Sequence, residues 1–148
     1  NKAFSHRNYC MKTKTLRQTV QFNAAPEHVY DMLMDSKKHS VFTGSECKIG
    51  KKVGDKISAY DGYIEGENLE LAPGRKIVQT WRASDWPEWH YSKATFEFAP
   101  AKGGTKLIFT QTGVPDEMAG EISEGWKEHY WGKMNAVIGA RFKKVVQR

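Results

Sequence analysis

The stretch KATFEFAPAKGGTKLIFTQ, residues 93–111, carries the clearest structural pattern in this chain of 148 residues. Apolar side chains occupy every second position on both sides of a glycine pair, at Ala94, Phe96, Phe98, Leu107 and Phe109. A period of two is that of a β-strand, whose successive side chains point to opposite faces. Glycines between two such runs are typical of a hairpin. The stretch therefore predicts two antiparallel strands with one apolar and one solvated face.

Short segments of the same kind precede this hairpin from Glu46 onward. They are rich in β-branched and aromatic residues, and turn-forming residues separate them at Gly50, Gly54, Asp61-Gly62, Pro73-Gly74 and Pro87. Residues 16–22 predict a first strand, which gives an antiparallel sheet of about six to seven strands. Ile77, Gln79 and Trp81 share one face of this sheet. Arg82 lies on the other face, where Glu97 of a neighbouring strand is a candidate ion-pair partner.

Two short helices are expected after the first strand. Pro26 suits the first position of a helix, because its missing N–H would have no partner there. Apolar residues then recur at helical spacing, at Val29, Tyr30, Leu33 and Met34. Asp35 or Ser36 can cap a second helix, and Gly44 is suited to end it.

A long helix is predicted after Pro115, with about 25 to 30 residues and an apolar arc that is wide for a surface helix. The arc includes Ile122, Trp126, Tyr130, Trp131, Met134 and Ile138. A sheet with one apolar face needs a partner layer, and this helix is the largest apolar partner available. The predicted fold is therefore α+β, a curved antiparallel sheet around a long C-terminal helix. Small residues are expected to leave room between the layers, at Ala59, Gly62, Gly66 and Ala94.

The composition favours a globular domain in a reducing setting. Apolar residues make up 39% of the chain, and no segment approaches the roughly 20 apolar residues of a membrane-spanning helix. Cys10 and Cys47 are the two cysteines, with neither a CxxC pair nor a Cys/His cluster for zinc. No secretory signal is visible at the start of the chain. We expect a cytoplasmic protein without a metal site.

The net charge of +6 is concentrated at the N-terminus, where five lysines and arginines precede the first acidic residue, Glu27. The remainder of the chain carries only about +1, without the basic stripe of a phosphate-binding face. Nucleic-acid binding is therefore not expected. Residues 1–14 are interpreted as a basic N-terminal arm or a non-native remnant, and residues 15–148 as a single domain.

A series of short motifs resembles one known family. The motifs are Phe42-Thr43-Gly44, Asp61-Gly62-Tyr63-Ile64-Glu65-Gly66, Leu71-Ala72-Pro73, Ile77-Val78-Gln79-Thr80-Trp81-Arg82, Trp86-Pro87-Glu88, Gly113-Val114-Pro115 and Gly125-Trp126. In order and spacing the series is similar to the C-terminal domain of activators of heat-shock-90 ATPase, within the START and birch-pollen-allergen-like SRPBCC superfamily. The resemblance covers about residues 15 to 145.

This resemblance implies a helix-grip fold with an internal cavity, and neither a metal nor an organic cofactor. Relatives in the superfamily bind lipids, sterols, hormones or polyketides, and a few branches act on them as cyclases or hydrolases. The co-chaperones similar to this chain carry a separate N-terminal domain, whereas a basic segment of about fourteen residues precedes the first predicted strand here. Gly54-Asp55 also replaces a glycine pair that is frequent in the family.

The expected ligand cavity lies between the sheet and the last helix, because pockets for small molecules combine aromatic walls with a few polar groups. Its candidate lining residues are Phe42, Ile57, Ile64, Gln79, Trp81, Trp86, Phe96, Phe109, Gln111, Trp126 and Tyr130. Gln79 and Gln111 can orient the polar end of a ligand. The alternative for Trp81, Trp126 and Tyr130 is plain core packing.

A second candidate site is the aromatic loop from Trp86 to Tyr91. Exposed loop aromatics mark contact sites, so Trp89, His90 and Tyr91 are candidate partner contacts. Trp89 is the most telling of them, because the family pattern usually has glycine there. Trp86 can instead fold back over the cavity mouth. A general acid–base role of His90 with Glu88 or Asp85 lacks an oxyanion site, and a solvated histidine is favoured.

Three functions follow from these observations. The first is non-catalytic binding of an apolar, lipid-like or aromatic small molecule. The alternative is a co-chaperone that binds a heat-shock-90 chaperone and stimulates its ATPase. The third, a cyclase or hydrolase, has no acid and base pair to support it, so an enzyme is not expected.

Overall fold

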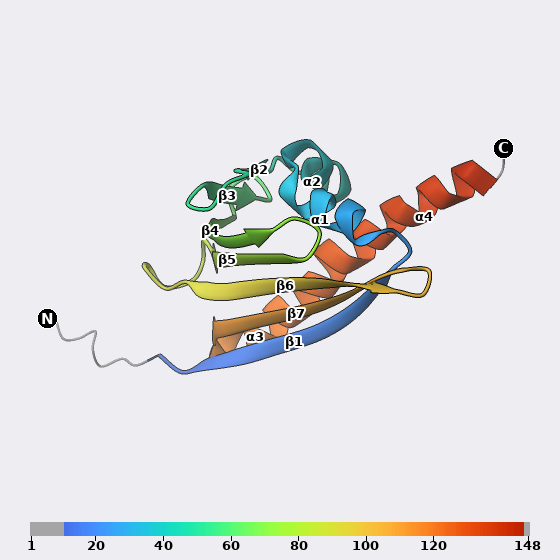
Figure 1. Cartoon of the computed structure of the whole chain (residues 1–148). Helices are drawn as coiled ribbons and strands as arrows, with labels where there is room; N and C mark the ends of the chain where they lie inside the picture. The colour runs from blue at the N-terminus through green and yellow to red at the C-terminus, as the bar shows by residue number, and fades with distance from the viewer. Residues whose placement is uncertain (1–10, 147–148) are drawn as a thin grey trace, which may run out of the picture.

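The computed structural model describes residues 11–146, and within them a seven-stranded antiparallel sheet curves around a long C-terminal helix (Figure 1). The strands are β1 (Thr13–Phe22), β2 (Lys48–Ile49), β3 (Lys56–Ala59), β4 (Ile64–Ala72), β5 (Lys76–Ala83), β6 (Ser92–Ala101) and β7 (Gly104–Pro115). β1 begins earlier than expected, so the last two residues assigned to the N-terminal arm belong to the sheet. The rest of that arm up to Cys10 lies outside the described residues.

The sheet confirms the predicted meander. Its strand order is β1-β7-β6-β5-β4-β3-β2, so every neighbour except β1 and β7 is also a neighbour along the chain. In the β6–β7 hairpin Phe96 pairs with Phe109, and Ala101 pairs with Gly104 at the turn. The apolar residues of both strands are buried, as their alternation predicted. Ile77, Gln79 and Trp81 of β5 also point into the core.

The two short helices form where the sequence placed them. α1 (Pro26–Met34) begins with its proline, and α2 (Ser36–Thr43) follows directly. The Asp35 side chain accepts a hydrogen bond from the Lys38 N–H and caps α2. Gly44 ends α2 in the left-handed conformation, with φ of 73°.

The predicted long last helix is confirmed, and it contains a π turn that was not expected. A 3₁₀ turn η2 (Asp116–Met118) leads into α3 (Ala119–Trp126), a π-helical turn η3 (Lys127–Trp131) and α4 (Gly132–Val146). The Gly132 N–H donates to the Lys127 carbonyl, five residues back. Residues five apart diverge on an α-helix, whereas a π turn brings them together. Trp126 and Trp131 consequently stack, with ring centroids 5.4 Å apart.

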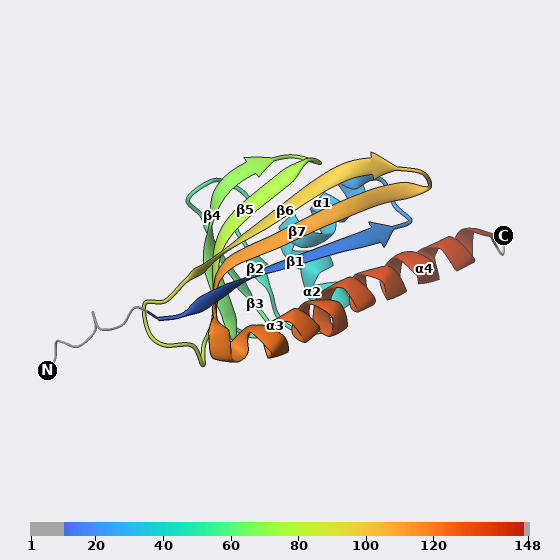
Figure 2. The same cartoon turned by 90° about the horizontal axis from the view of Figure 1, so that it is seen from below.

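Figure 2 shows the helical layer running along the concave side of the sheet. The core between them contains the fully buried Phe22, Leu107, Phe109 and Met134. Gly62 and Gly66 were expected to leave room between the sheet and the helix, and they do not. Gly62 lies in the exposed β3–β4 turn with φ of 91°. A Cβ on Gly66 would lie 1.8 Å from the Thr80 carbonyl oxygen, so this glycine permits close approach of β5. Within residues 11–146 no helix has the length and hydropathy needed to cross a membrane.

Candidate functional site

The residues expected to line a ligand cavity are buried together, and they leave almost no space between them. All eleven are at most 7% exposed. One interior space, bordered by Gln79, Trp81 and Trp126 among others, has a volume of about 10 Å³. That is room for about one water molecule. The interior of this grip is therefore a packed core.

Trp126 lies at the centre of this packing. Its ring centroid is 4.4 Å from that of Phe109 and 4.6 Å from that of Tyr130. On the sheet side it meets Trp81 at 5.5 Å and Phe96 at 5.8 Å. Tilted and edge-on arrangements of this kind are the favoured geometries of aromatic pairs. The rings of the predicted cavity wall thus contact one another.

The two glutamines that were expected to orient a ligand are bonded to protein groups. Gln111 donates to the Ser92 hydroxyl at 2.9 Å and accepts from the Trp126 indole N–H at 2.8 Å. Gln79 donates to the Asn68 side-chain oxygen at 3.0 Å. Buried amides need such partners. Here the fold itself supplies them.

His39 of α2 joins the two short helices to the long one. Its ring nitrogens lie 2.9 Å from the Leu33 carbonyl oxygen and 2.8 Å from the Tyr130 hydroxyl. Burial lowers the pKa of His39 to about 4, because the charged ring would lose its hydration. Burial also raises the pKa of Tyr130 well above its ordinary value. Both groups are therefore neutral in the folded protein at pH 7.

A hollow lies at one end of this core, between the β3–β4 turn and the start of the long helix. Its volume is about 580 Å³. Buried Ile64, Trp81, Trp126 and Tyr130 form its inner part, and these four belong to the predicted cavity set. Its exposed rim was not predicted and consists of Tyr63, Glu121, Glu124, Glu128 and His129.

Two tyrosines of the β3–β4 turn shape the mouth of this hollow. The Tyr60 hydroxyl donates to the His129 carbonyl at 2.7 Å and ties the turn to η3. The Tyr63 hydroxyl donates to Asp85 at 3.0 Å. Burial, the hydrogen bond to Asp85 and the charges of Asp85 and Glu121 raise the pKa of Tyr63. The mouth is therefore aromatic and electronegative.

A signal for this rim was present in the sequence. Glu121, Glu124 and Glu128 are spaced at i, i+3 and i+7, which places them on one face of a helix. The prediction of this helix rested on its apolar residues alone. The turn that lies opposite that face is decided by strand pairing. The curvature of the sheet, which brings Tyr60 to His129, cannot be read from the sequence.

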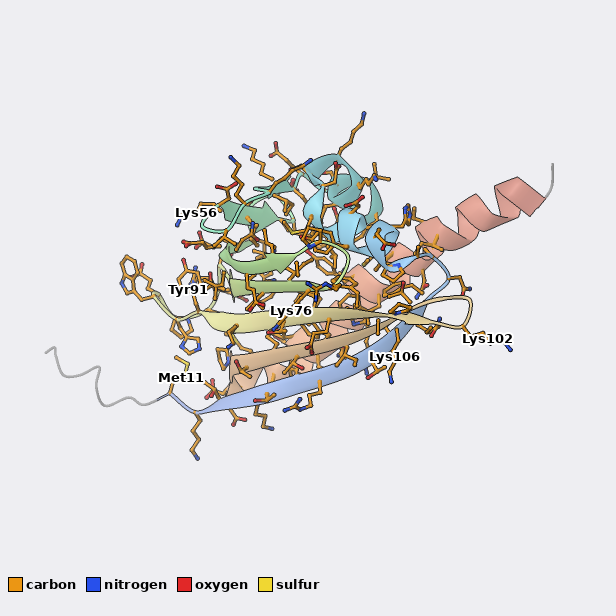
Figure 3. All side chains as sticks on the ribbon, viewed as in Figure 1. Met11, Lys56, Lys76, Tyr91, Lys102 and Lys106 are labelled. Atoms are coloured by element: carbon orange, nitrogen blue, oxygen red, sulfur yellow. The ribbon has the colours of Figure 1, made fainter. Side chains whose placement is uncertain are left out.

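The aromatic loop between β5 and β6 separates its two tryptophans. Trp86 is 3% exposed and contacts Trp81, with ring centroids 5.4 Å apart, so it folds back against the core. Trp89 is 88% exposed, and Tyr91 is 43% exposed. Figure 3 shows Tyr91 and Met11 at the same end of the molecule. Among the described residues, Trp89 is the most exposed large apolar side chain.

Arg82 and His90 hold this loop in place. Arg82 donates to the Trp86 carbonyl at 2.8 Å and pairs with Glu65 at 3.1 Å, so Glu65 of β4 is its partner in place of the expected Glu97. His90 contacts the Gly113 carbonyl at 2.7 Å. This histidine is half-buried and bonded to the backbone, neither freely solvated nor paired with Glu88 or Asp85. The geometry contains no acid–base pair at His90.

Cys47 is buried beside α2, and its sulfur lies 3.4 Å from the Thr43 hydroxyl. Among the described residues, no group of three or more His, Cys, Asp or Glu side chains could hold a metal ion.

Comparisons with known proteins agree on one family. Residues 23–139 match the model of the activator of Hsp90 ATPase homolog 1-like protein family. An activator of 90 kDa heat shock protein ATPase homolog from Dictyostelium discoideum is 38% identical over 79% of this chain and 31% of its own length. A human relative, homolog 1, is 29% identical over 84% of this chain and 36% of its own. The chain thus spans about a third of the curated relatives it matches.

Solved structures share the fold. The crystal structure of an HSP90 activator from Plasmodium falciparum is 27% identical, with a TM-score of 0.78 over 88% of this chain and 97% of that chain. A protein from Chromobacterium violaceum is also 27% identical, with a TM-score of 0.70 over 84% and 96% of the two chains. These neighbours are of the helix-grip type, as the sequence resemblance implied.

Proposed function

This chain belongs to the activator of Hsp90 ATPase homolog 1-like family, and we propose that it binds a heat-shock-90 chaperone and raises its ATP turnover. Two kinds of relatives support the proposal. The curated relatives are named as activators of this ATPase. The match to this chain covers 97% of the Plasmodium falciparum structure, which is described as an HSP90 activator.

The observation that carries the proposal is the conformation of Trp89. Its φ is 66°, in the left-handed region that favours glycine, and a bulky residue there costs on the order of 1 to 2 kcal/mol. The His90 N–H donates to the Pro87 carbonyl, which closes a turn with Trp89 at its third position. The indole is 88% exposed, so packing within the chain does not compensate the strain.

An exposed, strained indole on a loop held by Arg82 and His90 has the properties of an interface anchor. Tryptophan is the residue type most enriched among residues that dominate binding energy. A loop fixed in advance also loses little conformational freedom when it binds. We assign the chaperone contact to Trp89, with Tyr91 and the backbone-bonded His90 beside it.

The test measures both the stability and the activity of one variant, Trp89→Gly. Trp89→Gly relieves the backbone strain, so the domain is expected to be as stable as the natural chain or up to about 1 kcal/mol more stable. Removing the anchor is expected to weaken chaperone binding by about tenfold or more. Chemical denaturation measures stability, and ATP turnover of a purified heat-shock-90 chaperone over a titration of the domain measures activity.

Val41→Ala is the matched control, because Val41 is 65% exposed and lies on α2. It is expected to leave stimulation unchanged. If the natural chain at saturating excess leaves ATP turnover unchanged, the proposed function is refuted. If the natural chain stimulates and Trp89→Gly stimulates equally, the function stands and the assignment to Trp89 fails.

A second function, binding of an apolar or aromatic small molecule, is favoured by the hollow of about 580 Å³. Its volume lies within the range of roughly 300 to 1,000 Å³ typical of ligand pockets. The interior space bordered by Gln79, Trp81 and Trp126 is about 10 Å³, which is too small for such a ligand. The ligand would therefore bind at the end of the grip. A thermal-shift panel of lipidic and aromatic compounds tests this, and a bound compound raises the melting temperature.

A further inference from the structure

We propose that the hollow between the β3–β4 turn and α3 binds an organic cation with an apolar body, through aromatic walls beneath a carboxylate rim. This inference rests on the second proposed function, small-molecule binding in the hollow, and names the chemical class of the ligand. It is independent of the chaperone contact at Trp89, which is not among the residues lining the hollow.

The aromatic walls supply the first requirement. Trp81, Trp126 and Tyr130 line the inner part, and Tyr60 and Tyr63 line the mouth. An ammonium group within about 6 Å of an aromatic face is attracted by the negative potential of that face, most strongly for tryptophan. The attraction grows when water is excluded. A hollow with five such rings also buries an apolar body.

The charge of the rim supplies the second requirement. Three carboxylates line the hollow, from Glu121, Glu124 and Glu128. Lys127 pairs with Glu124 at 3.2 Å, and the His129 ring lies 3.7 Å from Glu128, where it is charged only if protonated.

Glu121 has no ion-pair partner among the described side chains, and its charge acts on Tyr63. No lysine or arginine is among the described residues that line the hollow. A cation therefore meets uncompensated negative charge there, whereas an anion is repelled.

Gly125 keeps part of the hollow open, although the fold does not require a glycine at this position. It lies in α3, where glycine is less favourable than alanine by about 1 kcal/mol. A Cβ at this position would meet nothing closer than the His129 ring, at 3.9 Å. Neither backbone conformation nor crowding requires glycine here. A side chain at residue 125 would instead project into the hollow that Gly125 lines.

Three probes of one shape test the proposal. They are (3-hydroxyphenyl)trimethylammonium, the neutral 3-tert-butylphenol and the anionic 3-hydroxybenzenesulfonate. Titrations followed by amide chemical shifts of Gly125 and His129 report binding at the hollow itself. We expect the ammonium to bind about tenfold more tightly than the neutral probe, in line with a desolvated cation–π contact and a nearby carboxylate. The sulfonate is expected to produce no saturable shift.

Two variants and a control separate the contributions. Gly125→Leu projects a branched side chain into the hollow and is expected to weaken binding of both the ammonium and the neutral probe at least tenfold. The double variant Glu121→Gln and Glu128→Gln is expected to lose the preference for the ammonium while retaining the neutral probe. Glu97→Gln removes an exposed carboxylate from β6 and is expected to change neither.

The outcomes distinguish the two levels of the proposal. If the neutral probe binds as tightly as the ammonium, the cation inference is overturned and small-molecule binding stands. If no probe shifts the Gly125 and His129 amides, both are overturned. Retention of the ammonium preference in the double glutamine variant would refute the role of the carboxylates.

Discussion

The packed interior and the open hollow are two sides of one aromatic wall. Ile64, Trp81, Trp126 and Tyr130 border both spaces, yet about 10 Å³ is free on one side and about 580 Å³ on the other. Toward the interior, the polar groups of Gln79, Gln111 and His39 are bonded within the chain. Toward the hollow, carboxylates face solvent. The difference teaches that in this helix-grip domain the open space lies at the end of the grip, where we propose that a ligand binds.

The largest expected effect follows from removing a ring on the packed side. Phe109 is fully buried between Phe96, Trp126 and Trp131. Phe109→Ala is expected to destabilise the fold by about 3 to 5 kcal/mol, because the cavity it leaves cannot close. Tyr63→Phe, on the rim, is expected to change stability by no more than about 0.5 kcal/mol. Urea denaturation measures both, and similar losses in the two variants would contradict the distinction.

A pH effect of intermediate size is expected from His39. Its folded-state pKa of about 4 lies below the ordinary value of 6.5, so the unfolded chain binds the proton more tightly. The contribution of His39 to stability is complete above pH 6.5, falls as the pH drops toward 4, and levels off below that. The total loss is on the order of 3 kcal/mol.

His39→Gln isolates this contribution, because glutamine does not titrate. The unfolding free energies of the natural chain and this variant are measured from pH 7.5 to pH 4. The natural chain is expected to lose stability relative to the variant as the pH falls from 6.5 toward 4. A constant difference across that range would show that His39 titrates alike in both states.

The contrast between interior and hollow also explains which features the sequence could predict. Alternation in residues 93–111 and the caps at Asp35 and Gly44 are local signals, and the corresponding strands and helices formed as expected. The π turn at Lys127–Trp131, which brings Trp126 and Trp131 together, had no such local signal. Whether inward aromatics enclose a void or fill it depends on sheet curvature, which a period-two pattern does not contain.

The smallest effects come from two glycines of the long helical layer, and their signs differ. Gly125 lines the hollow, and its Cβ would meet only the His129 ring, at 3.9 Å, so Gly125→Ala is expected to stabilise the domain by up to about 1 kcal/mol through helix propensity. Gly132 closes the π turn, and a Cβ there would lie 3.0 Å from the Lys127 carbonyl oxygen. Crowding opposes the same propensity gain, so Gly132→Ala is expected to be neutral or destabilising. Thermal unfolding of the pair measures the difference. Equal stabilisation by both substitutions would show that the π turn tolerates a methyl group, and that the stacking of Trp126 on Trp131 does not depend on glycine at its end.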